Sequence, residues 1–538
     1  MENDEFQKMF SRRCVLCFSL VALMFFSCVL RVAVAAMSDY SAVQQAQSSY
    51  RLKAGNLRGT IYDRNMVPLT NAETVTVAAV SPTPRAATAI SSVLNGEELE
   101  NVLERLQSGK PVLCRVPQSI DCDGITCAQV YVHNSSETQA VHMLGYTDHD
   151  GHGVSGLEKA YDELLYTDEA VSFVYTMDGL GGILEGIAPT VENKTSIIAA
   201  GVVSTLDVNL QTIAEQAAQR LESGAVIIAD CATSKIRASV SRPDFDVTNV
   251  SAYLNEDGAP LLNRATAAYN VGSIFKPCVA AAGIEEGHAA YVYECTGTCH
   301  IIDRDFRCHK KDGHGLMTLQ SGLANSCNTY FYNFAFLLGG DNIYHMASSL
   351  NFGKAFPICT GLSVAAGSMP KRESLSNIAY LANFSIGQGE LLLSPIAMLN
   401  LYAAIAGDGG YYLPSLVEAT VSDGVRTKVD IGAKTRVMSR ETAALLREYL
   451  TSVITDGTGV SAAPKTVTAA GKTATAQTGK YENGREICQG WFCGFFPAEQ
   501  PRYTVIVFSE NTEKQTASCG EIFAEIADRV TALEKIDK

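Results

Sequence analysis

Apolar residues form one long run near the N-terminus of the chain. Residues 14–30 (CVLCFSLVALMFFSCVL) carry no charge, and the preceding residues include Lys8, Arg12 and Arg13. A run of about 17–25 apolar residues is long enough to cross a bilayer, and basic residues before it favour a cytoplasmic N-terminus. We therefore expect a cytoplasmic tail over 1–13 and an uncleaved transmembrane anchor over 14–36. The alternative is a cleaved signal peptide, whose apolar core is usually shorter.

Polar and apolar positions alternate in shorter periods after this run. Residues 37–52 are polar and predict a juxtamembrane linker or helix. Asp207 is a good helix N-cap because Leu210, Ile213, Ala214 and Ala217 follow at helical spacing. Residues 224–230 (GAVIIAD) read as a buried strand.

The C-terminal part repeats the strand pattern. Residues 490–496 and 503–508 are apolar runs separated by a short turn, which predicts an antiparallel hairpin, and a helix is expected from 519 to 535. Strands at both ends of this region, with helices between them, predict an antiparallel sheet completed by distant segments.

Composition and charge narrow the functional classes. The 538 residues are 47% hydrophobic and 18% charged, a balance that is typical of a globular protein. The formal net charge is −15, without a block of like charges. Such a surface repels phosphate backbones, so nucleic-acid binding is not expected. A single apolar run also excludes a polytopic transporter.

Three short segments carry candidate chemistry. In Gly272-Ser273-Ile274-Phe275-Lys276-Pro277, a helix that begins near Ser273 would place Ser273 and Lys276 about one turn apart. An amine can deprotonate a serine hydroxyl if desolvation lowers the pKa of the amine. The motif alone is weak evidence, since it also describes an ordinary helix start with a solvated lysine.

The second and third segments lie further along the chain. Ser326-Cys327-Asn328 separates two helical patterns, over 316–325 and 329–338, and could relay a proton and donate an amide hydrogen bond. In the strand 471–478 (GKTATAQT), Lys472 offers positive charge, while Thr473 and Thr475 offer hydroxyls for a carboxylate. Separately, these segments could be an ordinary turn and a polar strand.

The order and spacing of the three segments are more specific than any one of them. S-x-x-K, then S-x-N about 50 residues later, then K-T-x before a terminal hairpin and helix, is the motif set of serine penicillin-recognising enzymes. The chain after the anchor resembles a class B penicillin-binding protein, a monofunctional peptidoglycan D,D-transpeptidase. The resemblance extends to RGTIYDRN (58–65), GLEKAYD (156–162), TLDVNLQ (205–211), NRATAAYNVGSIFKP (263–277), GHGLMTLQSGLANSCNTYF (313–331) and the glycine-rich 386–390.

The resemblance implies a fold and a division of labour among residues. It implies an α+β fold in two parts: an elongated pedestal domain over 53–205 and a transpeptidase domain over 215–535, with a five-stranded antiparallel sheet flanked by helices. The implied catalytic residues are the nucleophile Ser273, the general base Lys276, and Ser326, Asn328 and Lys472. The implied substrate-binding residues are Thr473, Ala474, Thr475, Gln388 and Gly389, with the oxyanion on the backbone N–H groups of Ser273 and Thr475.

The resemblance also implies partners. The substrates would be peptidoglycan stem pentapeptides, and β-lactams would acylate Ser273. The catalytic domain would lie outside the cytoplasm on a single-pass membrane anchor, where a polytopic glycosyltransferase could be its partner. No cofactor is implied. The alternatives are a catalytically weak scaffold for a cell-wall synthesis complex, a β-lactamase, which would not need residues 53–220, and a β-lactam sensor, which would need several membrane spans.

One residue departs from the family's usual pattern. The family usually has glycine where this chain has Ala474. By the alternation of a strand, Ala474 shares the face of Lys472, and its methyl group needs room near the serine helix. We expect altered β-lactam affinity more than lost chemistry.

A cysteine- and histidine-rich segment lies between the first two motifs. Cys295, Cys299, His300, Cys308, His309 and His314 have spacings that resemble zinc ligands. A disulfide such as Cys295–Cys308, or free thiols in a loop over the active-site cleft, are the alternatives. Because the family does not need a metal, we expect free thiols and no metal here, which implies a reducing or anaerobic exterior. The sequence leaves open whether the protein serves division, elongation or sporulation.

Overall fold

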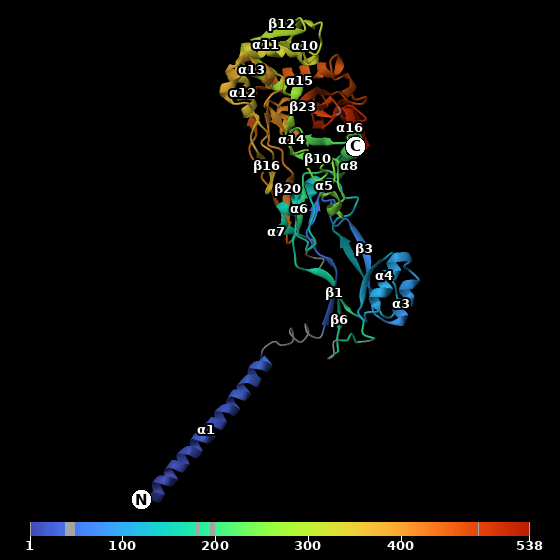
Figure 1. Ribbon diagram of the computed structural model, residues 1–538, viewed down its shortest axis with the longest axis vertical. Helices are drawn as coiled ribbons and strands as arrows, with labels where there is room; N and C mark the ends of the chain where they lie inside the picture. Colours follow the sequence, from blue (N-terminus) through green and yellow to red (C-terminus); the bar gives the residue numbers. More distant parts are fainter. Residues whose placement is uncertain are drawn as a thin grey trace. The chain divides into compact units, whose positions relative to one another are not determined.

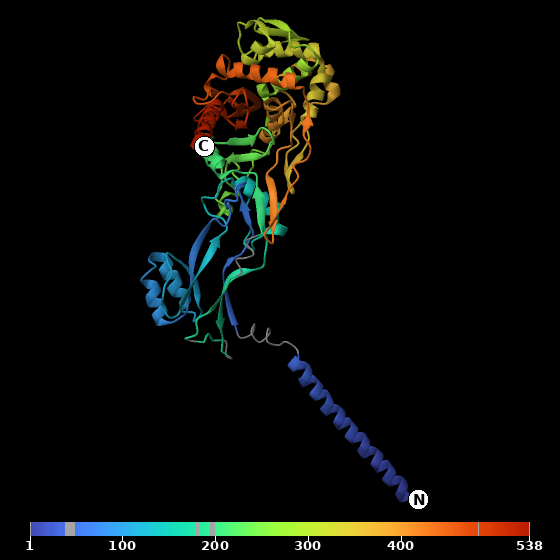
Figure 2. The ribbon, with the colours of Figure 1, turned by 180° about the vertical axis from the view of Figure 1, so that it is seen from behind.

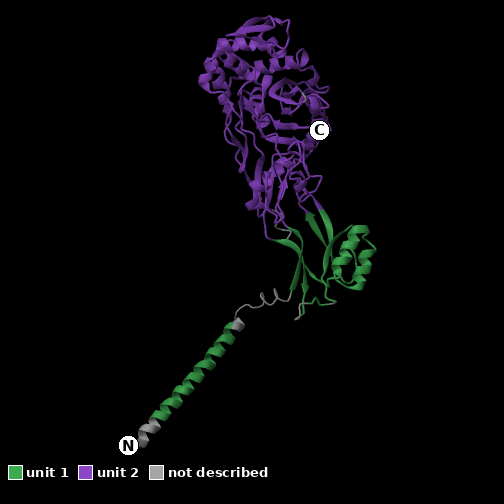
Figure 3. Cartoon of the chain, viewed as in Figure 1, with its two compact units in different colours: residues 1–56, 74–131, 169–194 green, residues 57–73, 132–168, 195–538 purple. Residues whose placement is uncertain are grey.

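The computed structural model describes residues 2–37, 49–178, 182–184, 186–193, 200–482 and 484–536. Contacts divide the chain into two compact units (Figure 3). The first comprises 1–56, 74–131 and 169–194, and the second comprises 57–73, 132–168 and 195–538. The second unit holds all three sequence motifs.

The N-terminal run is helical, as the sequence predicts. Helix α1 (Glu2–Met37) contains an apolar stretch, Met9–Val34, that is long enough to span a membrane, and no part of that stretch is buried. An exposed apolar helix of this length suggests a single-pass membrane anchor. Of the linker predicted over 37–52, residues 38–48 lie outside the described residues, and residues 49–52 already belong to strand β1.

The rest of the first unit contains two small sheets and two helices among its described residues. One contains β1 (Ser49–Asn56), β6 (Ala170–Thr176) and β7 (Thr190–Glu192). The other has the order β4 (Val112–Val116), β3 (Glu73–Val80) and β5 (Ile125–Val132). Helices α3 (Pro84–Ser91) and α4 (Gly96–Leu106) bury Ile90, Val102 and Leu106 against the second sheet.

A buried ion pair joins two of the resemblance motifs in the second unit. Arg58 Nε lies 2.6 Å from Glu158 Oε2, and both side chains are buried. The other carboxylate oxygen of Glu158 lies 2.8 Å from His133 Nε2. A buried charge needs such partners, so the 58–65 and 156–162 segments are held together by it. The second unit includes residues 57–73 and 132–168, which the sequence analysis places in the pedestal domain. The domain boundary at 205 stays a prediction.

The 58–65 segment also contributes a strand to one of the sheets of this unit. Strand β2 (Thr60–Tyr62) pairs in parallel with β8 (Gly201–Ser204). Strand β8 pairs in turn with β20 (Val417–Ser422), which forms a hairpin with β21 (Val425–Lys428). After β8, the Asp207 side chain caps helix α8 (Val208–Ala218) by accepting from the backbone N–H groups of Asn209 and Leu210, as the sequence predicts.

The centre of the second unit is a five-stranded antiparallel sheet (Figure 1). Its order is β10 (Ile236–Arg242), β9 (Gly224–Asp230), β25 (Tyr503–Ser509), β24 (Arg485–Phe496) and β23 (Ala470–Glu482). Strands from residues 224–242 and 470–509 thus meet in one sheet, which confirms the predicted α+β fold. Strand β23 lies at an edge of the sheet.

Both faces of this sheet are covered by helices. Val226 and Ile228 point to the face covered by α8 and by α16 (Cys519–Ile536), which lies beside the strands in dark red in Figure 2. Ile227, between them, points to the opposite face, as the pleat requires. The main core on that face includes α9 (Lys276–Glu285), α14 (Pro395–Ala406) and α15 (Arg440–Thr455).

Candidate active site

The candidate nucleophile lies on a tight turn at the start of a helix. Gly272–Phe275 forms a 3-10 turn, η3, and α9 begins at Lys276 with Pro277 as its next residue. Proline fits there because N–H groups of a first turn have no helical partner. Ile274 and Phe275 are fully buried and anchor the turn, whereas Ser273 is half-buried. The predicted helix start is therefore a 3-10 turn followed by an α-helix.

The glycine-rich loop is packed against this turn. Gly272 has φ +64° and Gly387 has φ +74°, a region that glycine adopts without strain. The Gly272 N–H donates to the Gly387 carbonyl at 2.8 Å, and a Cβ on Gly387 would lie 2.1 Å from the Gly272 carbonyl oxygen. No side chain fits at 387. The predicted substrate-binding residues Gln388, half-buried, and Gly389, exposed, follow on this loop.

The S-x-N motif forms the connection between two helices. Helix α10 (Leu319–Ala324) precedes it and α11 (Asn328–Leu338) follows it. The predicted helix over 316–325 starts late, because Thr318 and Ser321 form a capping box and the residues before Leu319 belong to strand β15 (Gly315–Thr318). Ser326 is buried at φ +51°, an unfavourable conformation for serine that is typical of functional sites.

The amine of Lys276 brings the first two motifs together. Its Nζ lies 3.2 Å from Ser326 Oγ, 2.7 Å from the Ser326 carbonyl oxygen and 2.7 Å from Asn328 Oδ1. The same ammonium group lies 5.4 Å from the centre of the Phe331 ring. Three residues that sequence analysis assigns to the active site, Lys276, Ser326 and Asn328, are therefore within hydrogen-bonding distance.

Burial changes the acidity of both lysines. Desolvation lowers the pKa of fully buried Lys276 to about 7, although the thiols of Cys327 and Cys308 oppose the shift. Desolvation, and secondly repulsion from Lys276, lower the pKa of Lys472 well below its usual value. The amine expected to act as a base is therefore partly neutral near pH 7. The fixed positive charge expected at Lys472 is not favoured by its surroundings.

The third motif lies on the edge strand β23. Lys472 and Ala474 are buried on one face, while Thr473 is half-buried and Thr475 exposed on the other. Thr473 Oγ1 lies 3.1 Å from Thr458 Oγ1. The Lys472 ammonium group donates to the Thr473 carbonyl at 3.2 Å. The outer edge of β23 pairs with no strand of the sheet among the described residues.

Ala474 lies against the serine turn, as the pleat predicts. A Cβ placed on Gly272 would lie 3.4 Å from the Ala474 Cβ and 3.2 Å from the Ala476 Cβ. Both alanines are buried. Strand β23 and η3 are thus in close contact, and the methyl group of Ala474 occupies space beside the turn that carries Ser273.

One contact of the expected mechanism is not formed. Ser273 Oγ makes no hydrogen bond to any described residue, and Lys276 Nζ donates instead to Ser326 and Asn328. Catalytic hydrogen bonds are often long before substrate binds and tighten in the complex. The arrangement can nevertheless supply a hydroxyl, a neutral amine and a relay hydroxyl on neighbouring elements.

The cysteine-rich segment differs from its expected arrangement. Cys295 and Cys308 are free thiols, so the disulfide considered between them is not formed. Their sulfur atoms lie with His314 and with Cys327, the middle residue of the S-x-N motif, which sequence analysis did not consider as a ligand. Cys299, His300 and His309 lie outside this group. No spacing rule connects Cys327 to the 295–314 segment, so only the fold reveals it.

Comparison with known proteins identifies the fold and the family. The family model "Penicillin binding protein transpeptidase domain" matches residues 224–530. Stage V sporulation protein D of Bacillus subtilis is 26% identical over 514 residues, covering 88% of this chain and 77% of the relative. Peptidoglycan D,D-transpeptidase MrdA of Acinetobacter baumannii is 28% identical over 421 residues, covering 70% of this chain and 60% of the relative.

Solved structures agree with this assignment at the level of the fold. Penicillin-binding protein 3 of Mycobacterium tuberculosis, complexed with aztreonam, has a TM-score of 0.65 and 23% identity, covering 90% of this chain and 98% of that one. The D,D-transpeptidase domain from Eggerthella lenta has a TM-score of 0.63 and 24% identity, with 90% and 99% coverage. The relatives are named as a stage V sporulation protein and as peptidoglycan D,D-transpeptidases. The chain therefore belongs to the penicillin-binding protein transpeptidases and, within them, to class B.

Proposed function

We propose that this chain is a membrane-anchored serine D,D-transpeptidase in which Ser273 is the nucleophile and Lys276 is its general base. The observation that carries the proposal is the convergence of the buried Lys276 amine on Ser326 and Asn328, one residue after the turn that bears Ser273. An amine with a pKa of about 7 is poised to accept a proton near neutral pH.

Acylation begins with attack by Ser273 Oγ on the carbonyl of the penultimate D-Ala of a stem pentapeptide. The hydroxyl proton passes to Lys276 Nζ, and the new C–O bond forms a tetrahedral oxyanion. Backbone N–H groups of Ser273 and Thr475 stabilise that charge. Lys276 returns the proton through Ser326 Oγ to the leaving nitrogen, the C–N bond breaks, and the terminal D-Ala departs.

Deacylation completes the cross-link. The amino group of a neighbouring stem peptide attacks the ester, loses a proton to the Lys276 and Ser326 pair, and Ser273 Oγ regains its proton as the new amide forms. A β-lactam would follow only the first half of this sequence, because its opened ring stays attached to the enzyme and keeps Ser273 acylated.

The third motif positions the substrate. Thr473 and Thr475 hydroxyls bind the terminal carboxylate, and the unpaired edge of β23 pairs with the extended peptide. Lys472 is buried with a lowered pKa, so a carboxylate bound beside it would restore its charge. Asn328 holds the donor peptide amide, and Gln388 and Gly389 border the site on the loop packed against Gly272.

The setting of the enzyme is also part of the proposal. Residues 1–13 are cytoplasmic, and the residues after the anchor lie outside the cell, with a pedestal domain over 53–205. A polytopic glycosyltransferase is the proposed partner in the membrane. Among the structural neighbours, a penicillin-binding protein of Helicobacter pylori is in complex with MreC, which supports the view that a protein of this fold can assemble with a protein partner.

The test is covalent labelling by a fluorescent penicillin. The wild-type chain should be acylated and should release the penicillin adduct slowly, and Ser273→Ala should not be labelled. Ser376→Ala is the matched control, because Ser376 also lies on a 3-10 turn but is exposed. A folded Ser273→Ala variant that still binds penicillin covalently contradicts the assignment. Absence of labelling in the wild type would favour the scaffold, and rapid release of the adduct would favour a β-lactamase.

A further inference from the structure

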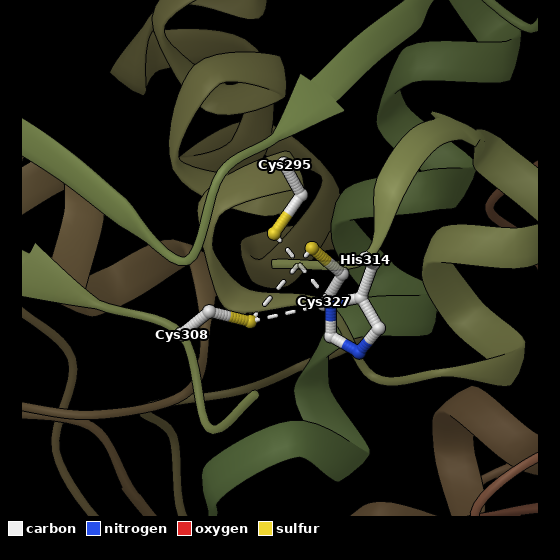
Figure 4. A group of neighbouring side chains, drawn as sticks. All are labelled: Cys295, Cys308, His314 and Cys327. Carbon is white, nitrogen blue, oxygen red and sulfur yellow. Dashed lines mark hydrogen bonds between the residues drawn. The ribbon is translucent and has the colours of Figure 1, made fainter. Parts of the chain in front are cut away.

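Four side chains from separate segments meet at one point beside the active-site loop. Cys295 ends strand β12 (Val292–Cys295), Cys308 follows β14 (Arg304–Arg307), and His314 precedes β15, while Cys327 lies immediately before α11. Figure 4 shows the four side chains turned toward a common centre. Their three sulfur atoms and one imidazole nitrogen all lie within 4.8 Å of one another.

The spacing of these atoms fits a tetrahedral metal site. His314 Nδ1 lies 3.5 Å from the sulfur atoms of both Cys295 and Cys308, and the sulfur atoms of Cys308 and Cys327 lie 3.9 Å apart. A tetrahedral zinc ion about 2.3 Å from sulfur and about 2.0 Å from nitrogen separates two sulfurs by about 3.8 Å and sulfur from nitrogen by about 3.5 Å. A disulfide would require about 2.0 Å between two sulfurs.

The loops that present these ligands are held in tight turns. Gly297 has φ +93° and Gly313 has φ +78°. A Cβ on Gly297 would lie 1.9 Å from the Lys311 carbonyl oxygen, and one on Gly313 would lie 2.2 Å from the Cys295 carbonyl oxygen. The Cys308 N–H also donates to the Gly297 carbonyl at 2.9 Å. The two loops are therefore packed backbone to backbone around the four side chains.

One hydroxyl group contacts two of the sulfur atoms. The Thr329 hydroxyl donates to Cys295 Sγ at 3.0 Å and lies 3.5 Å from Cys327 Sγ. Donors directed at sulfur stabilise metal-bound thiolates and fix their orientation. The three cysteines are buried, which removes competing water.

We infer that Cys295, Cys308, His314 and Cys327 bind one zinc ion. Three thiolates and one imidazole in tetrahedral positions are a ligand set that zinc prefers, and four protein ligands leave no open position for a substrate. The metal is therefore structural. Binding displaces the three thiol protons into solvent and needs no oxidant or reductant. This inference replaces the free thiols that the sequence analysis expects.

The zinc site has a consequence for the S-x-N loop. Cys327 lies between Ser326 and Asn328, the two residues that contact Lys276. A metal–thiolate bond at Cys327 would hold this connection, including the unfavourable backbone conformation of Ser326, in place. Zinc would thus position the proton-relay loop without touching the substrate. This second step, unlike the metal site itself, rests on the proposed function.

The metal site is tested first, without any activity measurement. The full-length protein is purified anaerobically, without chelators, and its metal content is measured. We expect about one zinc per chain, and a tetrahedral thiolate-to-cobalt spectrum after exchange with Co²⁺. Cys308→Ser should lose both signals. Cys299→Ser is the matched control, because Cys299 lies in the same segment but outside the group, and it should keep them.

The wild-type spectrum keeps the inference testable even if Cys308→Ser fails to fold. Wild-type protein that holds less than about 0.1 zinc per chain and gives no thiolate-to-cobalt band overturns it. A Cys308–Cys327 disulfide in the anaerobic protein, or equal metal loss in both cysteine variants, overturns it as well.

The effect on the loop is measured next. Chelator-treated wild type should be acylated by fluorescent penicillin about 10–100-fold more slowly than the zinc-loaded protein, and added zinc should restore the rate. Equal rates with and without bound zinc would refute the positioning role while leaving the metal site standing. Failure of the proposed function is distinguishable, since either the wild type would then not be labelled or Ser273→Ala would be labelled, whatever the metal content.

Discussion

The two sides of the short segment Ser326-Cys327-Asn328 have different chemistry. Ser326 and Asn328 contact the amine of Lys276, which is uncharged for part of the time near pH 7. Cys327, between them, contacts Cys308 and belongs to a group of three buried thiols and the half-buried His314. One side is suited to moving a proton, and the other is suited to fixing a backbone.

The comparison shows how one connection between two helices can both move a proton and hold its own backbone in place. A proton relay needs atoms that are held in place, yet Ser326 adopts a backbone conformation that costs about 1–2 kcal/mol for a residue with a side chain. Such a conformation persists only where neighbouring contacts impose it. The residue that can impose it here is the adjacent Cys327, through contacts outside the active site.

The largest expected effect concerns the proton-accepting side of the segment, where Ser326 and Asn328 contact Lys276. Lys276→Met keeps an unbranched apolar side chain in the buried site but removes the base, so acylation by penicillin should slow by about 10²–10⁴-fold. The second-order acylation rate constant of a fluorescent penicillin measures this. Zinc content should not change, because Lys276 is not among the four ligands.

The control for that variant is Lys371→Met, since Lys371 is an exposed lysine on the same unit. It should be acylated at the wild-type rate. If Lys276→Met lost zinc as well as acylation, the two sides of the segment would not be separable. A folded Lys276→Met that reacted as fast as wild type would exclude this amine as the base.

Sequence patterns predict the proton-accepting side of the segment and miss one of the four residues of the metal group, Cys327. S-x-x-K and S-x-N have fixed spacings, so Lys276, Ser326 and Asn328 can be grouped by their order in the chain alone. Apolar patterns likewise predict the strands at 224–230, 490–496 and 503–508, and the helix after the Asp207 cap, but not the edge strand β10. Cys327 cannot be grouped with Cys295 by spacing, because their contact depends on how β12 and α11 pack. The 3-10 turn at Ser273 is also missed, because its Gly272 contact with Gly387 is long-range.

The next-largest expected effect concerns only the metal-binding side of the segment, which is the group that contains Cys327. Thr329→Val removes the hydroxyl that donates to Cys295 Sγ while keeping the volume of a fully buried side chain. Zinc affinity, measured by competition with a chromophoric chelator, should fall by about 10–100-fold. At saturating zinc, acylation should stay close to the wild-type rate.

A matched control exists in the same unit. The buried Thr504 hydroxyl lies 3.1 Å from Cys231 Sγ, a free thiol outside the metal group. Thr504→Val therefore breaks the same kind of hydrogen bond and should leave zinc affinity unchanged. A similar loss of affinity in both variants would show that general destabilisation, and not the donor to Cys295, causes the effect.

The pH dependence of acylation sharpens the comparison further. The pKa of Lys276 is about 7, lowered by desolvation, and the groups that face it are Lys472 and the thiols of Cys308 and Cys327. Only the neutral amine accepts a proton, so the rate should rise about tenfold per pH unit below pH 7 and level off above it. Stopped-flow acylation between pH 5 and 9 measures the profile, and metal content is determined at each pH. A rate that falls as pH rises through 7 would contradict the role of a neutral lysine.

The smallest expected effect concerns Ala474, where the chain departs from its family. Its methyl group lies beside the turn of Ser273. Ala474→Gly removes that methyl group and also loosens the strand by about 0.5–1 kcal/mol, so β-lactam acylation should change by only about 2–5-fold. The comparison variant is Ala470→Gly, because Ala470 is buried on the same face of the same strand, on the other side of Lys472, and is not among the atoms nearest to Gly272. If the methyl group narrows the site, Ala474→Gly should be acylated faster than Ala470→Gly, although both should unfold at similarly lowered temperatures. Equal rates in the two variants would mean that Ala474 does not restrict access to Ser273. Since neither alanine is among the four metal ligands, zinc content should stay constant in both, which keeps this effect on the proton-accepting side of the segment.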